Sequence, residues 1–210
     1  LDYYPWVLGD KMSKNPKISA LSISNSNPFF RTYFDDNEWA IYTKTIQNPR
    51  INTSSMGRLF DAVGFVLGFH QPIYFEGEAA IYLEKLAQKQ YVKSKNVLVD
   101  YLENIVLSNN CIPTKLLFDI ILEHQQKGIS VGEIAANFHY TLIKCIEKVA
   151  STNKIRTLAF SGGVFQNSVL VDMIYEFLSN NFEVHLHENF SPNDENISFG
   201  QLNYYLNIKN

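Results

Sequence analysis

Residues 155–187 read IRTLAFSGGVFQNSVLVDMIYEFLSNNFEVHLH, and this stretch decides the fold class. Ile155–Phe160 is an apolar run typical of a buried strand, and Ser161–Gly163 is a turn. The pattern that follows predicts a helix over Val164–Ser179 and a second strand over Phe182–His187. A strand, a helix and a strand in this order predict two parallel strands joined by a right-handed crossover. The sequence therefore indicates an α/β fold.

Most of the remaining chain is expected to be helical. Residues 1–35 are rich in Ser, Asn and Pro, so we expect a short strand near Trp6 followed by irregular chain. The stretches Val97–Tyr101 and Asn104–Leu107 favour strands, and Asn109-Asn110 could turn or end a hairpin. Hydrophobic spacing with capping residues predicts helices elsewhere. These helices are Asn37–Gln47, Met56–Phe69, Glu76–Gln90, Pro113–Lys127, Val131–Ala150 and Asp194–Asn207.

The composition favours a well-packed globular chain. Of the 210 residues, 46% are hydrophobic, with 15 Phe and 12 Tyr, which excludes a disordered polypeptide. The net charge is −3 and the basic residues are scattered, so we expect no nucleic-acid surface. Cys111 and Cys145 are too few for a disulfide framework or a Cys-rich zinc site.

No apolar run approaches the ~18 residues that a membrane helix needs, and no leader segment is visible. We therefore expect a cytoplasmic protein without a membrane partner. The chain begins at Leu1 in a segment that is already apolar. This start indicates a piece of a longer protein.

The Gly162-Gly163 pair lies between a predicted strand and a predicted helix. Glycine lets the backbone approach a ligand closely, and the first N–H groups of a helix attract anions. Ligands of open α/β sheets bind at the carboxyl ends of the strands, where this turn lies. Asn167, one turn into the predicted helix, could hydrogen-bond a ribose or a phosphate. On local grounds a tight structural turn explains the glycines equally well.

Several carboxylates and histidines have both a structural and a functional interpretation. Asp194 begins the last predicted helix, where helix capping is favoured over metal binding on local grounds. Asp61 and Glu76 lie near glycines and could hold ribose hydroxyls, although solvated helix faces explain them more simply. His185 and His187 share one face of a strand and could chelate a metal, but a solvent-facing edge is the simpler interpretation. His139 reads as a hydrogen-bonded core histidine.

Five motifs in order resemble those of HypF-type carbamoyltransferases. They are SSMGRLFDAV at 54–63, YFEGEAA at 74–80, IAANFHYTL at 134–142, SGGVFQN at 161–167 and SPNDENISFGQ at 191–201. The motif at 161–167 matches the family pattern without change. Because the five motifs are spread over residues 54–201 in the family's order, the resemblance is specific.

The resemblance implies the actin/sugar-kinase-like (ASKHA) ATPase fold of the TsaD-type tRNA threonylcarbamoyl transferases. Residues 1–50 would be the tail of a preceding lobe and a connection, and residues 51–210 the C-terminal lobe with a helical insertion. Another domain would make carbamoyl-adenylate from carbamoyl phosphate and ATP. This domain would then pass the carbamoyl group to the C-terminal cysteine of a HypE-type partner. In the family this step begins the synthesis of the cyanide ligands of nickel–iron hydrogenases.

Site residues are also implied by the resemblance. The turn around the nucleotide phosphate would be Gly162, Gly163 and Asn167. The nucleoside, from ATP or AMP, would be lined by Gly57, Asp61, Glu76 and Gly77. Asp194 would bind a divalent metal of unspecified identity, and no catalytic residue is implied.

The sequence departs from the family pattern after Asp194. Glu195-Asn196 stands where the family has Gly-Gly, which adds a carboxylate near the expected metal. The paired histidines of the family's metal site, its zinc modules, its acylphosphatase-like domain and its adenylate-forming domain are absent from these 210 residues. We therefore expect half of a cleft that does not turn over alone.

A non-catalytic module that binds nucleotide weakly, or docks on its partner or on upstream domains of the same enzyme, is the alternative. A small-molecule kinase of the same superfamily is a weaker one, since no general base accompanies the Gly-Gly turn.

Overall fold

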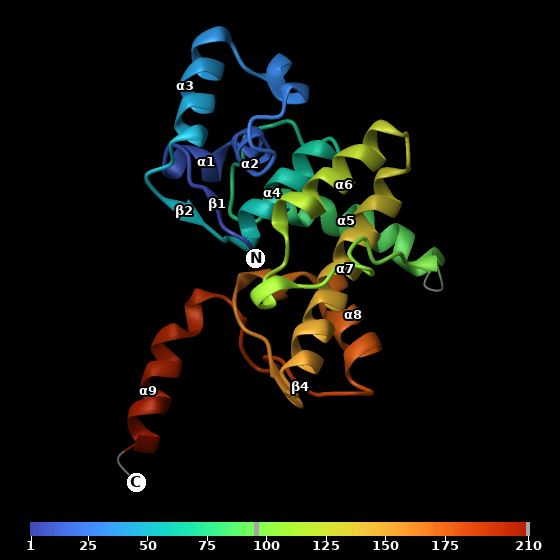
Figure 1. The fold of residues 1–210 in the computed structure, drawn as a ribbon. Helices are drawn as coiled ribbons and strands as arrows, with labels where there is room; N and C mark the ends of the chain where they lie inside the picture. Colours follow the sequence, from blue (N-terminus) through green and yellow to red (C-terminus); the bar gives the residue numbers. More distant parts are fainter. Residues whose placement is uncertain (95–96, 209–210) are drawn as a thin grey trace.

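The computed structural model describes residues 1–94 and 97–208, and helices make up most of it (Figure 1). The strands form two separate two-stranded sheets. The helices are α1 (Asp10–Lys14), α2 (Pro16–Ile23), α3 (Asp36–Gln47), α4 (Met56–Val66), α5 (Glu78–Ser94), α6 (Thr114–Gln126), α7 (Val131–Thr152), α8 (Ser168–Leu178) and α9 (Ile197–Ile208). The strands are β1 (Tyr4–Pro5), β2 (Asn52–Thr53), β3 (Thr157–Ala159) and β4 (Glu183–His185).

The core is built around α4 and α7. α4 packs against α2, α5 and α6, and α7 packs against α5, α6 and α8. Their buried apolar residues belong to one hydrophobic cluster that runs from Tyr4 to Phe182. The cluster contains Ile46 as well as Leu59, so the core continues past residue 50. The division of the chain at residue 50 stays a prediction.

The predicted strand–helix–strand unit is confirmed. β3 and β4 are parallel, with Leu158 opposite Val184, and α8 connects them. Its details differ from the prediction in two ways. A 3-10 turn, η4 (Gly163–Gln166), precedes α8, so the predicted helix start at Val164 was wrong. β3 is also not a buried strand, since Thr157 and Ala159 are exposed and Leu158 is half-buried.

The N-terminal segment is more helical than predicted. α1, α2 and the 3-10 turn η1 (Pro28–Tyr33) occupy the stretch that was expected to be irregular. All residues of α2 except Lys17 are buried. A helix buried on every side has no polar face, so no amphipathic period marks it in the sequence. The strand expected near Trp6 is β1, which pairs with β2 in antiparallel orientation.

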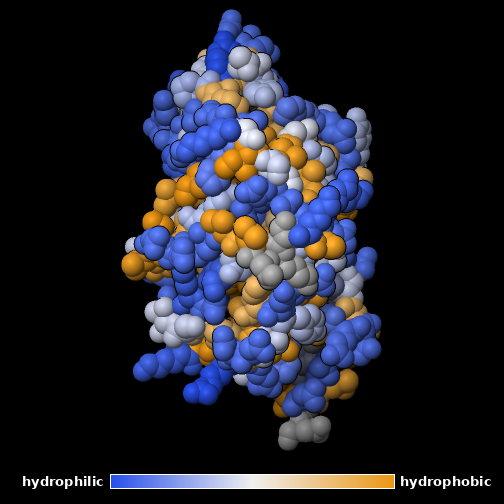
Figure 2. Space-filling view, turned by 90° about the vertical axis from the view of Figure 1, so that its right-hand side faces the viewer, coloured by the Kyte–Doolittle hydropathy of each residue, from blue (hydrophilic) through white to orange (hydrophobic). Residues whose placement is uncertain are grey.

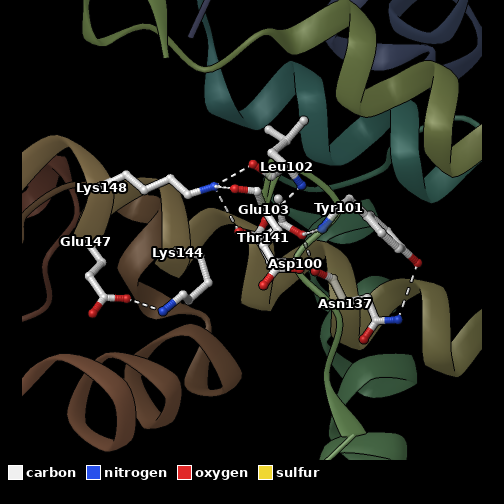
Figure 3. Close-up of polar contacts among 9 residues, drawn as sticks. All are labelled: Asp100, Tyr101, Leu102, Glu103, Asn137, Thr141, Lys144, Glu147 and Lys148. Carbon is white, nitrogen blue, oxygen red and sulfur yellow. Dashed lines mark hydrogen bonds and ion pairs between the residues drawn. The ribbon is translucent and has the colours of Figure 1, made fainter. Parts of the chain in front are cut away.

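The hairpin predicted between residues 97 and 107 was wrong, because side chains of α7 hold this segment (Figure 3). The N–H of Val99 donates to Asn137 Oδ1 at 3.0 Å, and the N–H of Tyr101 donates to Thr141 Oγ1 at 2.9 Å. Lys148 Nζ donates to Asp100 Oδ2 at 3.1 Å. Side chains thus take the backbone donors that a partner strand would have used. The turn expected at Asn109-Asn110 is a short 3-10 element, η3 (Ser108–Asn110).

The other predicted helices are confirmed, with ends that differ by a few residues. α6 and α7 are separated by Gly128, whose φ of +76° suits glycine. The last predicted helix is divided into a 3-10 turn, η5 (Asp194–Asn196), and α9. None of the helices in the described ranges combines the length and the apolar content needed to cross a bilayer.

α9 extends away from the rest of the molecule (Figure 1), and none of its residues is buried. Its exposed side chains include large apolar ones. These are Ile197, Phe199, Leu202, Tyr204, Tyr205, Leu206 and Ile208. Apolar patches also lie among polar side chains on the face shown in Figure 2. Exposed apolar side chains that gather on one element favour contact with another surface.

We expect Thr141→Val to loosen the segment that α7 holds. The substitution removes the acceptor of the Tyr101 N–H inside a buried environment, which costs about 1–3 kcal/mol. Chemical denaturation is expected to reveal this loss, and hydrogen exchange is expected to be faster at the Tyr101 amide. Thr45→Val, at a half-buried position of α3 whose Oγ1 donates an exposed hydrogen bond to the Ile41 carbonyl oxygen, is the control, and its effect is expected to stay within about 0.5 kcal/mol. Equal stability of the two variants would contradict the role of this hydrogen bond.

Candidate functional site

A cleft of about 990 Å³ lies between the start of α4, the start of α5, the turn before α8 and the turn before α9. Four segments that are far apart in the sequence therefore meet at one place. The residues that line it are Ser55, Gly57, Arg58, Phe60, Asp61, Glu76, Gly77, Ala80, Ile81, Glu84, Gly163, Val164, Gln166, Asn167, Asn193, Asp194 and Glu195.

This cleft contains all the predicted site residues except one. Those that line it are Gly57, Asp61, Glu76, Gly77, Gly163, Asn167 and Asp194. Gly162 is not among the lining residues, and its N–H donates to the carbonyl oxygen of Pro192 at 2.7 Å. Gly162 thus ties the turn before α8 to the turn before α9, and its N–H is not available to an anion. Its φ of +107° explains why a glycine stands there.

α4 brings a buried ion pair to the cleft. Ser55 caps the helix by accepting a hydrogen bond from the Arg58 N–H at 3.4 Å, and Asp61 follows one turn later. Asp61 is only 3% exposed, and its Oδ2 lies 3.1 Å from Arg58 Nη2. The two groups are close but not aligned, because neither Asp61 Oδ2 nor Arg58 Nη1 has a hydrogen-bond partner in the described part of the chain. Both retain hydrogen-bonding capacity that a ligand could use.

Burial raises the pKa of the Asp61 carboxyl to about 7, and the Arg58 guanidinium opposes this shift. Desolvation dominates because the ionised carboxylate loses water without gaining an aligned hydrogen bond. A carboxyl group perturbed in this way within a cleft is typical of functional sites. The simpler interpretation of Asp61 as part of a solvated helix face was therefore wrong.

The turn before α8 offers two backbone donors to the cleft. The N–H groups of Gly163 and Val164 have no acceptor among the described residues. A Cβ added at Gly163 would meet only Gln166 Oε1, at 3.9 Å, and Gly163 is not among the residues with positive φ. Neither packing nor backbone conformation therefore requires glycine at position 163. Room for a ligand against the backbone is the remaining physical reason.

Asn167 is the N-cap of α8. The prediction that it lies one turn into the helix was therefore wrong. Its Oδ1 accepts from the Leu170 N–H at 3.0 Å, and its Nδ2 lies 3.0 Å from His139 Nε2. The His139 ring is fully buried, and its Nδ1 also hydrogen-bonds the Ala135 carbonyl oxygen. His139 is thus confirmed as a hydrogen-bonded core histidine.

Asp194 is exposed at the edge of the cleft and begins η5. The cap of η5 is Asn193, whose side chain accepts from the Glu195 N–H at 3.2 Å, so the capping role predicted for Asp194 was wrong. Within the described ranges, His, Cys, Asp and Glu form no group of three or more that could hold a metal ion. These residues therefore do not complete a metal site, and Asp194 as a metal ligand stays a prediction.

The histidines of β4 and its extension do not converge on one point. His185 Nε2 lies 3.2 Å from Glu183 Oε1, and His187 Nε2 lies 3.1 Å from Ser161 Oγ. Both histidines are exposed. The solvent-facing edge is the interpretation that fits these positions.

Two charged residues of the cleft, Arg58 and Glu84, were missed in the sequence. Glu84 Oε1 accepts from the Ser168 N–H at 2.9 Å, which ties α5 to the start of α8. Gly77, Ala80 and Glu84 are spaced so that they share one face of a helix. This spacing could have placed Glu84 on the side that faces the cleft. Arg58 lies three residues before Asp61, a spacing at which ion pairs form on a helix.

Comparison with known proteins gives a consistent result. Residues 1–201 match the sequence family described as "Carbamoyltransferase, Kae1-like Domain, second subdomain". The chain is 32% identical over 161 residues to carbamoyltransferase HypF of Synechocystis sp., covering 71% of this chain and 19% of that protein. It is 27% identical over 173 residues to carbamoyltransferase HypF2 of Cupriavidus necator, covering 71% of this chain and 21% of that protein. The chain thus spans about a fifth of the length of these relatives.

Two solved structures have a similar fold. A full-length HypF in the phosphate- and nucleotide-bound form has a TM-score of 0.74 and 29% identity, covering 96% of this chain and 27% of that chain. The HypF of T. kodakarensis has a TM-score of 0.74 and 23% identity, covering 96% of this chain and 28% of that one. The mixed α/β fold expected from the sequence is thus confirmed, as is the resemblance to HypF proteins.

We expect Asp61→Asn to stabilise the chain at neutral pH. The unfolded chain loses the Asp61 proton near pH 4, whereas the folded chain keeps it until about pH 7. Between these values the folded state binds more protons, so this residue makes the free energy of unfolding fall as pH rises. The stability gained by Asp61→Asn over the wild type is expected to grow between pH 4 and 7, by roughly 2–4 kcal/mol, and then to level off.

Urea denaturation at several pH values measures this difference. Asp10→Asn, at an exposed position, controls for the loss of one negative charge. A difference that does not change between pH 4 and 7 would show that Asp61 titrates like an ordinary carboxyl group.

Proposed function

The chain belongs to the HypF family of carbamoyltransferases, and we propose that it supplies one wall of the nucleotide site of a longer carbamoyltransferase. The observation that carries this proposal is the cleft, in which seven of the residues implied by the family resemblance lie together. Its free backbone N–H groups at Gly163 and Val164 suit an anionic group, and its carboxylates suit hydroxyl donors or a cation. In this proposal residues 51–210 are the C-terminal lobe of an ASKHA fold, and residues 1–50 are a connection from the preceding lobe.

The nucleotide in this proposal lies with its phosphate at the turn before α8. The free N–H groups of Gly163 and Val164 are suited to phosphate oxygens, as in other turns that precede helices. Asp61 and Arg58 keep unused hydrogen-bonding capacity, which suits the nucleoside with Gly57, Glu76 and Gly77 around it. One of the similar proteins was solved in a phosphate- and nucleotide-bound form, which agrees with this assignment.

The charge of the cleft favours a cation beside the nucleotide. Its described lining includes one basic side chain, Arg58, and several acidic ones. The acidic side chains are Asp61, Glu76, Glu84, Asp194 and Glu195. An anionic phosphate beside these carboxylates needs a counter-charge. Asp194 would be one ligand of a divalent metal, with further ligands from outside the described residues.

The chemistry that we propose for the whole enzyme is transfer of a carbamoyl group from carbamoyl-adenylate. The thiolate of the acceptor cysteine forms a bond to the carbonyl carbon. The bond from that carbon to the phosphate oxygen breaks, and AMP leaves with the electron pair. No protein nucleophile is needed because the mixed anhydride is already activated. The cleft's part is to hold the adenylate away from water and to hydrogen-bond the departing phosphate.

The partners in this proposal are a HypE-type acceptor protein and the other domains of the same enzyme. The exposed apolar side chains of α9 support a contact with a further surface. A non-catalytic fragment that binds nucleotide, or only docks on those domains, is the alternative. Exposure of α9 agrees with both functions, so nucleotide binding and carbamoyl transfer are the properties that separate them.

Titration calorimetry of AMP and ATP, with magnesium, tests the nucleotide site on the chain itself. We expect binding that Gly163→Arg weakens at least about tenfold, because the new side chain fills the space against the turn. Asp61→Ala is expected to weaken binding by a similar factor, because an acceptor in the cleft is lost. Gly200→Arg on α9 is the matched control, since a Cβ there meets no atom within 4 Å and Gly200 does not line the cleft.

No binding by a chain shown to be folded would contradict a nucleotide site on this lobe alone. Binding that survives both cleft substitutions would contradict the residue assignment. Binding lost equally in the α9 control would indicate a general loss of structure.

We expect no carbamoyl transfer by this chain alone. Carbamoyl phosphate, ATP, magnesium and a HypE-type acceptor would be incubated with the chain, and the acceptor cysteine followed by mass spectrometry. Transfer is expected only when the remaining domains of the enzyme are added as a second polypeptide, since the adenylate must be made elsewhere. Transfer by the chain alone would overturn the half-cleft interpretation.

A further inference from the structure

We propose that His139 is a positioning residue, which orients the Asn167 amide so that it donates a hydrogen bond toward the phosphate-bearing ligand. This inference rests on the proposed nucleotide site and extends it to a residue that does not line the cleft. His139 lies behind the cleft wall on α7, and Asn167 stands at the start of α8. Packing of α7 against α8 brings the two together.

The first hydrogen bond fixes the tautomer of His139. Its Nδ1 lies 2.7 Å from the carbonyl oxygen of Ala135, one helical turn earlier. A carbonyl oxygen only accepts, so Nδ1 must carry the hydrogen. Nε2 of the neutral ring is then an acceptor, which faces Asn167 Nδ2 at 3.0 Å. His139 therefore holds the amine end of the Asn167 amide.

The second end of the amide is held by α8. Oδ1 of Asn167 accepts from the Leu170 N–H at 3.0 Å, as the cap of the helix. Both contacts require the same orientation of the amide, so a flipped amide would break both. One hydrogen on Nδ2 is left over, and Asn167 lines the cleft. Asn167 Nδ2 can therefore donate this remaining hydrogen to a ligand in the cleft, and a phosphate or hydroxyl oxygen is a suitable acceptor.

The surroundings of His139 keep its ring in place and neutral. The ring is fully buried, and the rings of Phe60 and Phe138 contact it edge-to-face with centroids 5.4 and 5.5 Å away. Burial lowers the pKa of His139 to about 4, although the Ala135 carbonyl opposes this shift. The ring therefore keeps a free acceptor at Nε2 at neutral pH. Phe60 also lines the cleft, so the same wall holds ring and ligand.

The orientation can be tested without a ligand. Nitrogen-15 NMR of the histidine rings in the 210-residue chain at pH 7 distinguishes a protonated Nδ1 from a protonated Nε2. We expect His139 to carry its hydrogen on Nδ1 alone. A hydrogen on Nε2, with or without one on Nδ1, would overturn the inference, because Asn167 could then not donate to that nitrogen.

The role in binding is tested by AMP titration with magnesium into three variants. His139→Leu removes the acceptor, and we expect AMP affinity to fall at least about fivefold. His139→Gln supplies an acceptor at a similar reach, so affinity is expected to return to within about twofold of the wild type. Thr141→Val, two residues away on α7, also loses a buried hydrogen bond but does not contact Asn167. Its affinity is expected to stay within about twofold.

The outcomes separate this inference from the proposed function. Wild-type affinity in His139→Leu overturns the positioning role even if the tautomer is as expected. An equal loss of AMP affinity in His139→Leu and Thr141→Val would show that His139 has only a structural role, which also overturns the inference. No AMP binding by the folded wild type counts against the proposed nucleotide site, whereas the NMR result still decides whether His139 orients Asn167.

Discussion

The packing of α7 against both α5 and α8 is the constraint on which the cleft depends. α5 supplies one wall, and the turn before α8 supplies another. Two polar contacts set the relation of these walls, an exposed one from Glu84 to Ser168 and a buried one from His139 to Asn167. Polar contacts of this kind are directional, whereas apolar packing tolerates sliding. The site is thus held by these two hydrogen bonds, of which only the one between His139 and Asn167 is buried.

Most of the helices could be predicted from the sequence because they are amphipathic. α4, α6 and α7 have apolar residues at helical spacing, and the caps Ser55 and Ser130 mark the starts of α4 and α7. α2 could not be predicted, because a helix buried on every side lacks that period. The segment at Val99–Tyr101 resembled a strand by composition alone. Its backbone is held by side chains of α7, and such tertiary contacts leave no local signature.

The cleft was predictable in outline, because glycines and carboxylates stood near the ends of expected elements. What the sequence could not give was the environment of each group. Asp61 reads as an ordinary helix-face carboxylate until its burial is known. Gly162 and Gly163 read alike, yet one N–H is taken by Pro192 while the other is free. Asn167 and His139 are 28 positions apart, and only the crossing of α7 and α8 joins them.

The exposed apolar side chains of α9 affect how much of the chain survives in a cell. Its row of exposed Phe, Tyr, Leu and Ile side chains is the kind of surface that chaperones bind and proteases find. Unless something covers the helix, quality control would compete with function for each newly made molecule. The amount of chain that accumulates would then follow the supply of whatever surface covers α9, so abundance would be matched to assembly without a dedicated regulator.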